Sequence, residues 1–189
     1  MIAKTLLMAT LVLTLSACAD DQKFSPAQMQ PSDILYDQIE VPSFQKTQWT
    51  VGTFIMTDDS GWIPAERETL RNLTRDFDLA VAQALQKAGY LATEAKQAKY
   101  RVSGEIIDFE LPNCLYGSCD GGTTIKYRVE STQGNVLFEE IAVVPYTKEA
   151  DFALEHNLDV IYPHAAAMLG ENIAHFIQLI SRKKASDFE

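Results

Sequence analysis

The spacing of hydrophobic residues predicts two long helices. Apolar side chains recur every three or four positions through residues 65–88 and again from Pro163 to about Lys183, which is typical of helices with one buried stripe. Gly89 follows the first helix as a C-cap, and Pro163 is expected at the first position of the second helix. The predicted stripes are Leu70, Leu73, Phe77, Ala80, Val81, Ala84 and Leu85, and then Ala166, Leu169, Ile173, Phe176, Ile177 and Ile180.

A second pattern, rich in β-branched and aromatic residues, predicts strands at 49–56, 100–111, 123–131 and 136–145. In 100–111 the apolar side switches at Ile106–Ile107, which predicts a β-bulge. Pro145 is expected to end the last strand or to mark an edge, and 146–162 to form a loop with a short helix. The order β-α-β-β-β-α predicts an α+β fold: a two-layer sandwich with a mainly antiparallel sheet and two helices packed on one face. The other face of the sheet is then uncovered.

The first 17 residues have the pattern of an export signal. Lys4 precedes an apolar run from Leu6 to Leu15, which is shorter than the 20 or so residues that span a bilayer. The alternative is a buried N-terminal helix. The run has no polar face and no helix cap follows it, so we expect a signal peptide.

Leu15, Ser16, Ala17 and Cys18 end this segment and resemble the lipobox of bacterial lipoproteins. The resemblance implies that signal peptidase recognises the first three residues, that the Cys18 thiol receives diacylglycerol, and that cleavage before Cys18 is followed by acylation of the new amine. Several acyl chains would anchor the mature protein firmly, without a membrane span. Ala19 replaces the aspartate that retains enteric lipoproteins in the inner membrane. The implied location is therefore the periplasmic face of the outer membrane, rather than the inner membrane.

Three segments follow from this interpretation: a lipoprotein signal peptide at 1–17, the lipidated cysteine with a tether at 18–47, and a single α+β periplasmic domain at 48–189. The tether interpretation rests on three prolines and weak apolar periodicity. A flexible chain of this length reaches roughly 30 Å. One alternative stays open, that part of this segment packs on the domain through Ile34, Leu35, Tyr36, Ile39 and Val41.

Charge narrows the classes of partner. The chain has 189 residues, a formal net charge of −10 and a pI near 4.7. This acidity argues against nucleic acid as a partner, because phosphates are bound by basic surfaces. It also argues against electrostatic docking on anionic lipid.

Two cysteines, Cys114 and Cys119, lie close together between two predicted strands. In an oxidising periplasm a disulfide between them is expected. A zinc site would need further thiolate or imidazole ligands at suitable spacing, and a redox-active pair is usually Cys-x-x-Cys at a helix start. Leu115 and Tyr116 lie between the cysteines and are candidate contacts for a partner, with ordinary loop variation as the alternative.

The sequence offers little evidence of catalysis, and we expect no enzyme, no metal and no cofactor beyond the acyl groups on Cys18. His156, His164 and His175 are spaced too widely to share an ion on one helix. Glu105 is expected to point away from Asp108 and Glu110 in a regular strand, which weakens a paired-carboxylate site. No nucleophile-elbow, zinc-protease or P-loop motif is present.

The element order and four segments resemble small periplasm-facing lipoproteins: PqiC-like auxiliary lipoproteins of transport systems, YajG-like lipoproteins and, more loosely, LptE. The segments are ETLRNLTRDFDLAVAQALQKAGY, YRVSGEIIDFE, TTIKYRVESTQGNVLFEE and HAAAMLGENIAHFIQLI. The resemblance implies a non-enzymatic accessory subunit in envelope assembly, maintenance or transport, anchored by lipid and bound to an envelope protein or to lipid. Two alternatives are a module that binds lipid or another amphipathic ligand between sheet and helices, and an envelope enzyme or enzyme inhibitor.

Overall fold

The computed structural model describes residues 25–57, 64–115, 117–149 and 158–188, with side chains described for 25–57, 73–110, 117–149 and 162–188. Four strands form one sheet in the order β1-β2-β3-β4: β1 (Trp49–Met56), β2 (Tyr100–Leu115), β3 (Ser118–Ser131) and β4 (Val136–Glu149). The pairs β2–β3 and β3–β4 are antiparallel, and β1 runs parallel to β2. A parallel pair needs a long crossover, which the helix α2 (Pro64–Lys87) provides.

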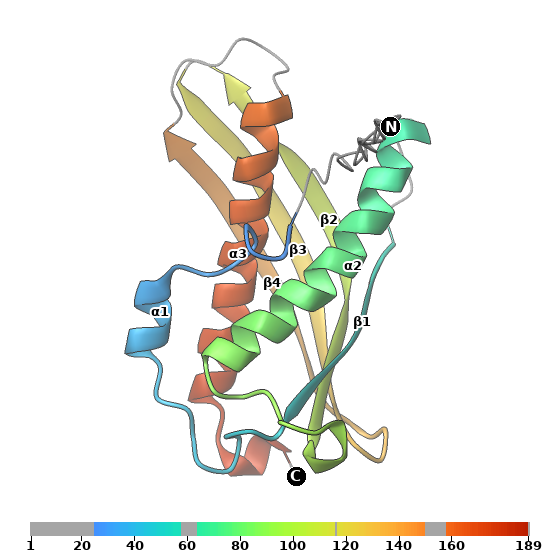
Figure 1. Ribbon diagram of the computed structural model, residues 1–189, viewed down its shortest axis with the longest axis vertical. Coiled ribbons are helices and arrows are strands. Elements are labelled where there is room, and N and C mark those ends of the chain that lie inside the picture. Colours follow the sequence, from blue (N-terminus) through green and yellow to red (C-terminus); the bar gives the residue numbers. More distant parts are fainter. Residues whose placement is uncertain (1–24, 58–63, 116, 150–157, 189) are drawn as a thin grey trace, which may run out of the picture.

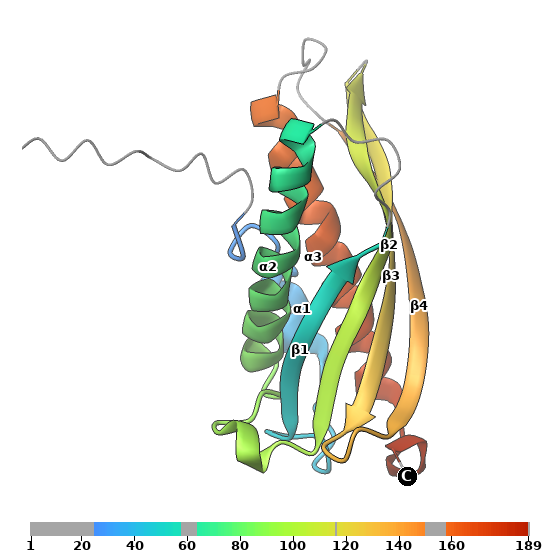
Figure 2. The same ribbon diagram turned by 90° about the vertical axis from the view of Figure 1, so that its right-hand side faces the viewer.

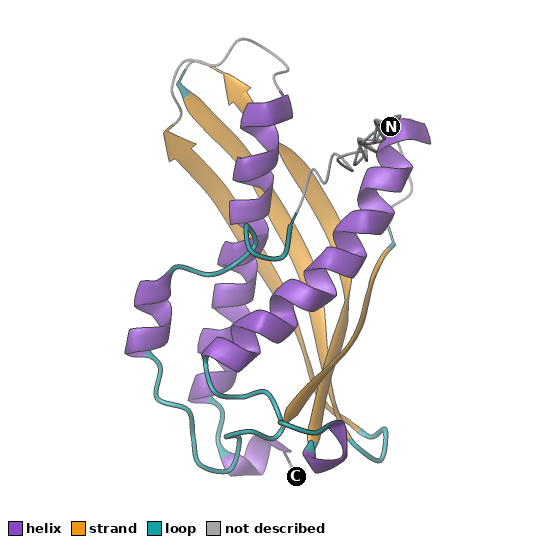
Figure 3. Ribbon diagram, in the orientation of Figure 1, coloured by secondary structure: helices purple, strands orange, loops and turns teal. Residues whose placement is uncertain are grey.

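The two long helices, α2 and α3 (Leu158–Arg182), lie on the same face of the sheet (Figure 2). The predicted α+β fold with two layers is confirmed. Figures 1 and 3 also show shorter helices around this framework. These are α1 (Asp33–Gln38), η1 (Ala95–Gln97) and η2 (Ala185–Phe188).

Side chains alternate along the strands as the sequence predicts. Ile125, Tyr127 and Val129 of β3 are fully buried, and the charged residues between them lie on the opposite face. The register of β2 against β3 shifts between Ile106 and Asp108, where the apolar side switches, so the predicted bulge is confirmed.

Aromatic rings fill the space between the sheet and the helices. Tyr127 of β3 stacks on Phe176 of α3 with ring centroids 4.3 Å apart, and Trp49 meets the same Phe176 at 6.2 Å. Phe54 of β1 contacts the Phe77 ring of α2 edge to face, at 5.1 Å. The described members of both predicted helix stripes are buried, namely Leu73, Phe77, Ala80, Val81, Ala84, Leu85, Ala166, Leu169, Ile173, Phe176, Ile177 and Ile180.

One buried polar network joins α3 to the sheet. The Tyr127 hydroxyl donates to Asn172 Oδ1 over 2.9 Å, and Asn172 Nδ2 donates to Thr123 Oγ1 over 2.7 Å and to the Ala142 carbonyl over 3.3 Å. Burial raises the pKa of Tyr127 well above its ordinary value, because the phenolate would lose its hydration. The network fixes the position of α3 over β3 and β4, since buried polar groups are costly without their partners.

Two predicted boundaries are wrong. The helix α3 begins at Leu158, so Pro163 lies inside it rather than at its first position. Proline inside a helix removes one hydrogen bond to the carbonyl four residues earlier. Here the loss falls near the start of α3, and the tertiary contacts of α3 with the sheet stabilise the helix despite it. The strand β4 continues through Pro145 to Glu149, so its predicted end is wrong. The alternative that Pro145 marks an edge is confirmed, because β4 is an edge strand and an edge tolerates proline.

Residues 25–47, which the sequence analysis assigned to the tether, lie against the domain, and we call them the N-terminal strap. Met29 is fully buried, and the Gln30 side chain donates to the Ala80 carbonyl of α2 over 3.2 Å. Further along, buried Gln45 donates to the Ile180 carbonyl of α3 over 2.8 Å. The alternative that part of this segment packs on the domain is confirmed for Leu35, Tyr36, Ile39 and Val41, whereas Ile34 is 65% exposed.

Glycine in α3 makes room for the strap. A Cβ atom added to Gly170 would lie 2.9 Å from the Gln30 carbonyl oxygen and 3.2 Å from the Met29 carbonyl carbon. These distances are too short for a side chain, so the backbone of the strap can approach α3 only because residue 170 is glycine.

Within the described residues, no helix is both long enough and apolar enough to cross a membrane.

Candidate functional site

The face of the sheet away from the helices carries a mixed set of charged and aliphatic side chains. The registers place Ile55, Glu105, Lys126 and Ile141 in one row across all four strands. We call this surface the open sheet face, and its other members are Thr53, Ser103, Thr124, Arg128, Glu139 and Val143.

Ion pairs lie at the centre of the open sheet face and aliphatic side chains lie at its margins. Lys126 Nζ is 3.0 Å from Glu139 Oε2, and Arg128 Nε is 2.9 Å from Glu130 Oε1. The aliphatic side chains at the margins are more than half exposed, at 56% for Ile55, 54% for Ile141 and 66% for Val143. A shallow depression of about 240 Å³ is lined by Ile55 and by the ion-pair residues Lys126, Arg128 and Glu139. Exposed aliphatic groups beside charged ones are typical of protein-binding surfaces, where the apolar groups supply affinity and the charges supply specificity.

The bulge in β2 changes the position of its carboxylates. Glu105 pairs with Lys126, Asp108 with Thr124 and Glu110 with Gly122. These three partners alternate with the buried residues of β3, so all three carboxylates share the open sheet face. The expectation that Glu105 points away from the other two is therefore wrong, because it assumed a regular strand. The three carboxyl groups follow one strand and face solvent, without the enclosure that a paired-carboxylate site requires.

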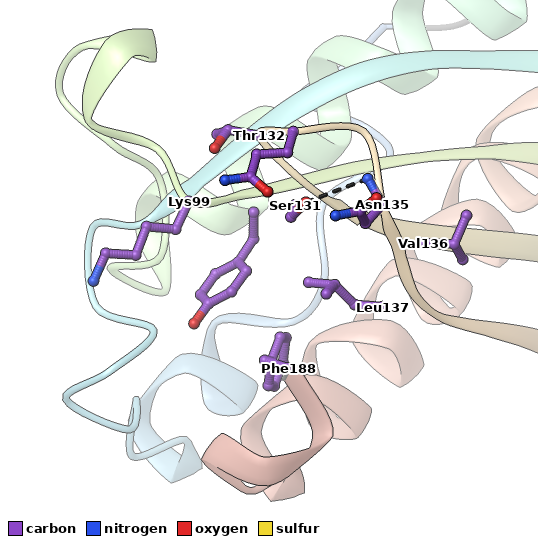
Figure 4. Close-up of a pocket in the computed structure, with 9 residues that line it drawn as sticks. Lys99, Ser131, Thr132, Asn135, Val136, Leu137 and Phe188 are labelled. Carbon is purple, nitrogen blue, oxygen red and sulfur yellow. Dashed lines mark hydrogen bonds between the residues drawn. The ribbon is translucent and has the colours of Figure 1, made fainter.

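A second concave region lies at the end of the sheet where β3 turns into β4 (Figure 4). Its volume is about 610 Å³, and η2 closes one side of it through Phe188. The backbone N–H of Asn135 donates to Ser131 Oγ over 3.3 Å and holds the turn. The remaining lining residues are Lys99, Tyr100, Thr132, Gln133, Val136 and Leu137. Because the residues of the turn are largely exposed, this region resembles a surface hollow rather than an enclosed ligand site.

The two cysteines near the tip of the β2–β3 hairpin lie opposite each other. The register pairs Cys114 with Cys119 and Leu115 with Ser118, so the strands continue almost to the turn. Gly117 has φ +86°, a conformation that glycine adopts readily in a tight turn. Tyr116 and the lipobox residues Leu15, Ser16, Ala17 and Cys18 lie outside the described residues, as does the side chain of Leu115.

The two described histidines, His164 and His175, lie apart from each other on α3. The His164 Nδ1 atom and the Tyr146 hydroxyl share a hydrogen bond of 2.9 Å, and His175 is exposed on α3. Burial and the nearby Glu171 carboxylate raise the pKa of Tyr146. His156 lies outside the described residues. In the described part of the chain, no three histidine, cysteine or acidic residues are grouped in a way that could hold a metal ion.

The edge of β1 is bound by a side chain from α2. The Asp78 carboxylate accepts the Phe54 backbone N–H over 2.8 Å, at the irregularity between Val51 and Phe54. Burial raises the pKa of Asp78, and the hydrogen bond from Phe54 opposes that shift. Asp78 was not predicted from the sequence, and neither were Gln30, Gln45 and Gly170, which fix the strap. Their contacts join segments that are distant in sequence, so no local pattern could have indicated them.

Taken together, the described surface is suited to binding a macromolecule. The rings between sheet and helices occupy the space that a lipid or amphipathic ligand would need in that position. The open sheet face is broad and solvent-facing, and its row of side chains crosses all four strands.

The fold is similar to that of a solved structure, whereas the comparisons of sequence found no match. No protein-family description matches the chain, and no curated protein matches its sequence. Among solved structures, a DUF330 protein from Xanthomonas campestris is similar over 76% of this chain and 91% of its own, with a TM-score of 0.51 and 10% identity. That similarity shows a shared fold and leaves function open.

Two further solved structures are less similar to this chain. One is named as a "putative lipoprotein" from Caulobacter crescentus; the match covers 56% of this chain and 77% of that one, with 8% identity and a TM-score of 0.44. The other is the PelC dodecamer from Paraburkholderia phytofirmans; here the match covers 72% and 92%, with 10% identity and a TM-score of 0.44. Neither similarity is close enough to carry an argument about this chain.

Proposed function

We propose that this protein is a bacterial envelope lipoprotein, anchored through Cys18 to the periplasmic face of the outer membrane, and that it acts as a non-enzymatic accessory subunit. The structural observation behind the proposal is the open sheet face. Both long helices cover one side of the sheet, and the other side exposes ion pairs flanked by Ile55, Ile141 and Val143. The lipobox at residues 15–18 provides the anchor. A fixed anchor and an exposed binding face are what an accessory subunit needs to hold a partner at the membrane.

The anchor is tested by replacing Cys18 with serine. We expect the native protein to incorporate a labelled fatty acid and to sediment with membranes, and the Cys18→Ser protein to do neither, because the acceptor thiol is absent. A second variant exchanges residues 1–18 for a cleavable export signal, so that an uncleaved leader cannot hold the protein in the membrane. A folded domain of this variant in the membrane fraction, or a labelled Cys18→Ser protein, would contradict the proposal.

The accessory role is tested with the same anchored protein. A photo-crosslinker at Ile141, on the open sheet face, should trap one envelope protein in stoichiometric yield in living cells. The same crosslinker at exposed Leu79 of α2 is the matched control and should not trap that protein. Recovery of lipid without a protein partner at position 141 would favour the lipid-binding alternative instead.

We also propose that Cys114 and Cys119 form a disulfide that closes the hairpin tip. Directly opposed residues of an antiparallel pair are close enough for this bond. With Cys18 acylated, the chain has no other cysteine, so the denatured mature protein should take up a maleimide only after reduction. The Cys114→Ala and Cys119→Ala double variant should lose about 2 kcal/mol of stability. Labelling of the unreduced protein would show that the thiols are free.

A further inference from the structure

The strap determines where the anchor joins the domain. Residues 29 and 30 lie between the two long helices, with Gln30 bonded to Ala80 of α2 and its backbone against Gly170 of α3. Gly170 is close to the midpoint of α3, which begins at Leu158 and ends at Arg182. In Figure 2 the start of the strap lies on the outer side of the helices, away from the sheet. The chain therefore leaves the domain at the middle of its helix layer.

Little chain remains to connect this point to the membrane. From Cys18 to Ser25 there are seven peptide links, which span at most about 25 Å even when fully extended. The distance from Gly170 to either end of α3 is already about 18 Å, and the helix-to-sheet separation of roughly 10 Å adds to it. This stretch is therefore too short to reach the open sheet face around either end of α3, and the most direct attachment of the domain to the membrane is through its helix layer.

The charge of the helix layer fits the surface of a bilayer. Although the chain has 26 acidic residues, those at the positions of α2 and α3 whose side chains the structure describes are buried or half-buried, namely Asp76, Asp78 and Glu171. On the strap beside these helices, Asp33, Asp37 and Glu40 are exposed, and Asp33 lies 3.3 Å from Lys87 Nζ. The exposed positions on the two long helices are Arg75, Leu79, Gln83, Gln86 and Lys87, and Pro163, His175, Gln178 and Arg182. Anionic phospholipid attracts basic side chains and repels carboxylates, so the exposed positions of α2 and α3 suit its surface better than the open sheet face, which carries Glu105 and Glu139.

We propose that the outer side of α2 and α3 lies against the phospholipid surface and that the open sheet face points away from the membrane, toward a periplasmic partner. The inference rests on the proposed lipid anchor and adds an orientation to it. The partner would then meet the open sheet face in the periplasm, rather than beside the membrane. Leu79, half exposed on the outer side of α2, would lie near the lipid headgroups.

The experiment compares two positions of similar exposure in the acylated, full-length mature protein. Leu79→Cys and Ile141→Cys variants carry a thiol-linked fluorophore and are reconstituted in vesicles of phosphatidylethanolamine and phosphatidylglycerol with a headgroup-bound nitroxide quencher. We expect several-fold stronger quenching at position 79 than at position 141. The protein without an added cysteine measures any background from the native cysteines. Gln86→Cys and Val143→Cys form a second pair in case one of the first variants does not fold.

A linker insertion provides the control for the tether. About 20 glycine and serine residues between residues 24 and 25 add roughly 25 Å of mean reach and should remove most of the difference between the two positions. Equal quenching without the insertion, or stronger quenching at position 141, would overturn the orientation while leaving the anchor intact. Absence of acyl groups or of vesicle binding would instead overturn the proposed function.

Discussion

The Gly104→Ala protein is expected to lose about 3 kcal/mol of its free energy of unfolding. Gly104 lies in β2, and a Cβ atom there would overlap the Lys126 carbonyl oxygen and lie 2.7 Å from the Phe54 ring. The carbonyl belongs to the neighbouring strand and cannot move without breaking the ladder, and the ring is held in the core by Phe77 and Tyr127. Overpacking of this kind costs about 1–3 kcal/mol, and a backbone overlap falls at the upper end.

Gly122→Ala provides the matched control, since Gly122 lies on the adjacent strand of the same sheet. A Cβ atom there would come no closer than 3.5 Å, to the Val144 carbonyl oxygen. Its stability should change by less than about 1 kcal/mol, and toward greater stability, because alanine restricts the unfolded chain. Urea denaturation followed by circular dichroism measures both variants. Equal stability of the two proteins would show that the close approach at Gly104 does not constrain the sheet.

The Phe176→Ala protein is expected to lose about 3–5 kcal/mol, since truncating a buried phenylalanine removes hydrophobic burial and leaves a cavity. The ring is fully buried and lies between the stacked Tyr127 ring and the edge of Trp49. Its loss would also loosen α3 over the network at Asn172, because Tyr127 belongs to both contacts.

The neighbouring His175→Ala substitution is the control for this helix. His175 is exposed, so its replacement should change stability by no more than about 0.5 kcal/mol. Thermal and urea unfolding of both variants give the comparison. A loss below about 1 kcal/mol for Phe176→Ala would show that the core readily fills the space left by the ring.

Local patterns predicted most of the framework. The spacing of Phe77, Val81, Ile173 and Phe176 identified the buried sides of both helices, because the helical period is a strong and local signal. The bulge at Ile106 was also predictable, since it interrupts a two-residue period. The ends of the helices and strands were less predictable. Pro163 is a strong local signal for a helix start, and the tertiary contacts of α3 outweigh it.

The contacts of the strap and the arrangement of the open sheet face could be recognised only in the structure. Gln30, Gln45 and Gly170 act through contacts between distant segments, and their sequence neighbourhood gives no indication of them. The open sheet face was expected as an uncovered surface, yet its row of Ile55, Glu105, Lys126 and Ile141 depends on strand register, which periodicity alone does not determine.

The contacts of the strap also constrain the order in which the protein folds. Gln45 and Trp49 are near the start of the chain, and their partners Ile180, Phe176 and Phe188 are near its end. The β2–β3–β4 meander closes through short turns, so its loop-closure entropy is small and it can form early. The first part of the domain to be synthesised is thus buried only after the last helix arrives. Until then Met29 and Trp49 remain exposed to solvent, which makes the newly made chain a substrate for chaperones that bind apolar segments.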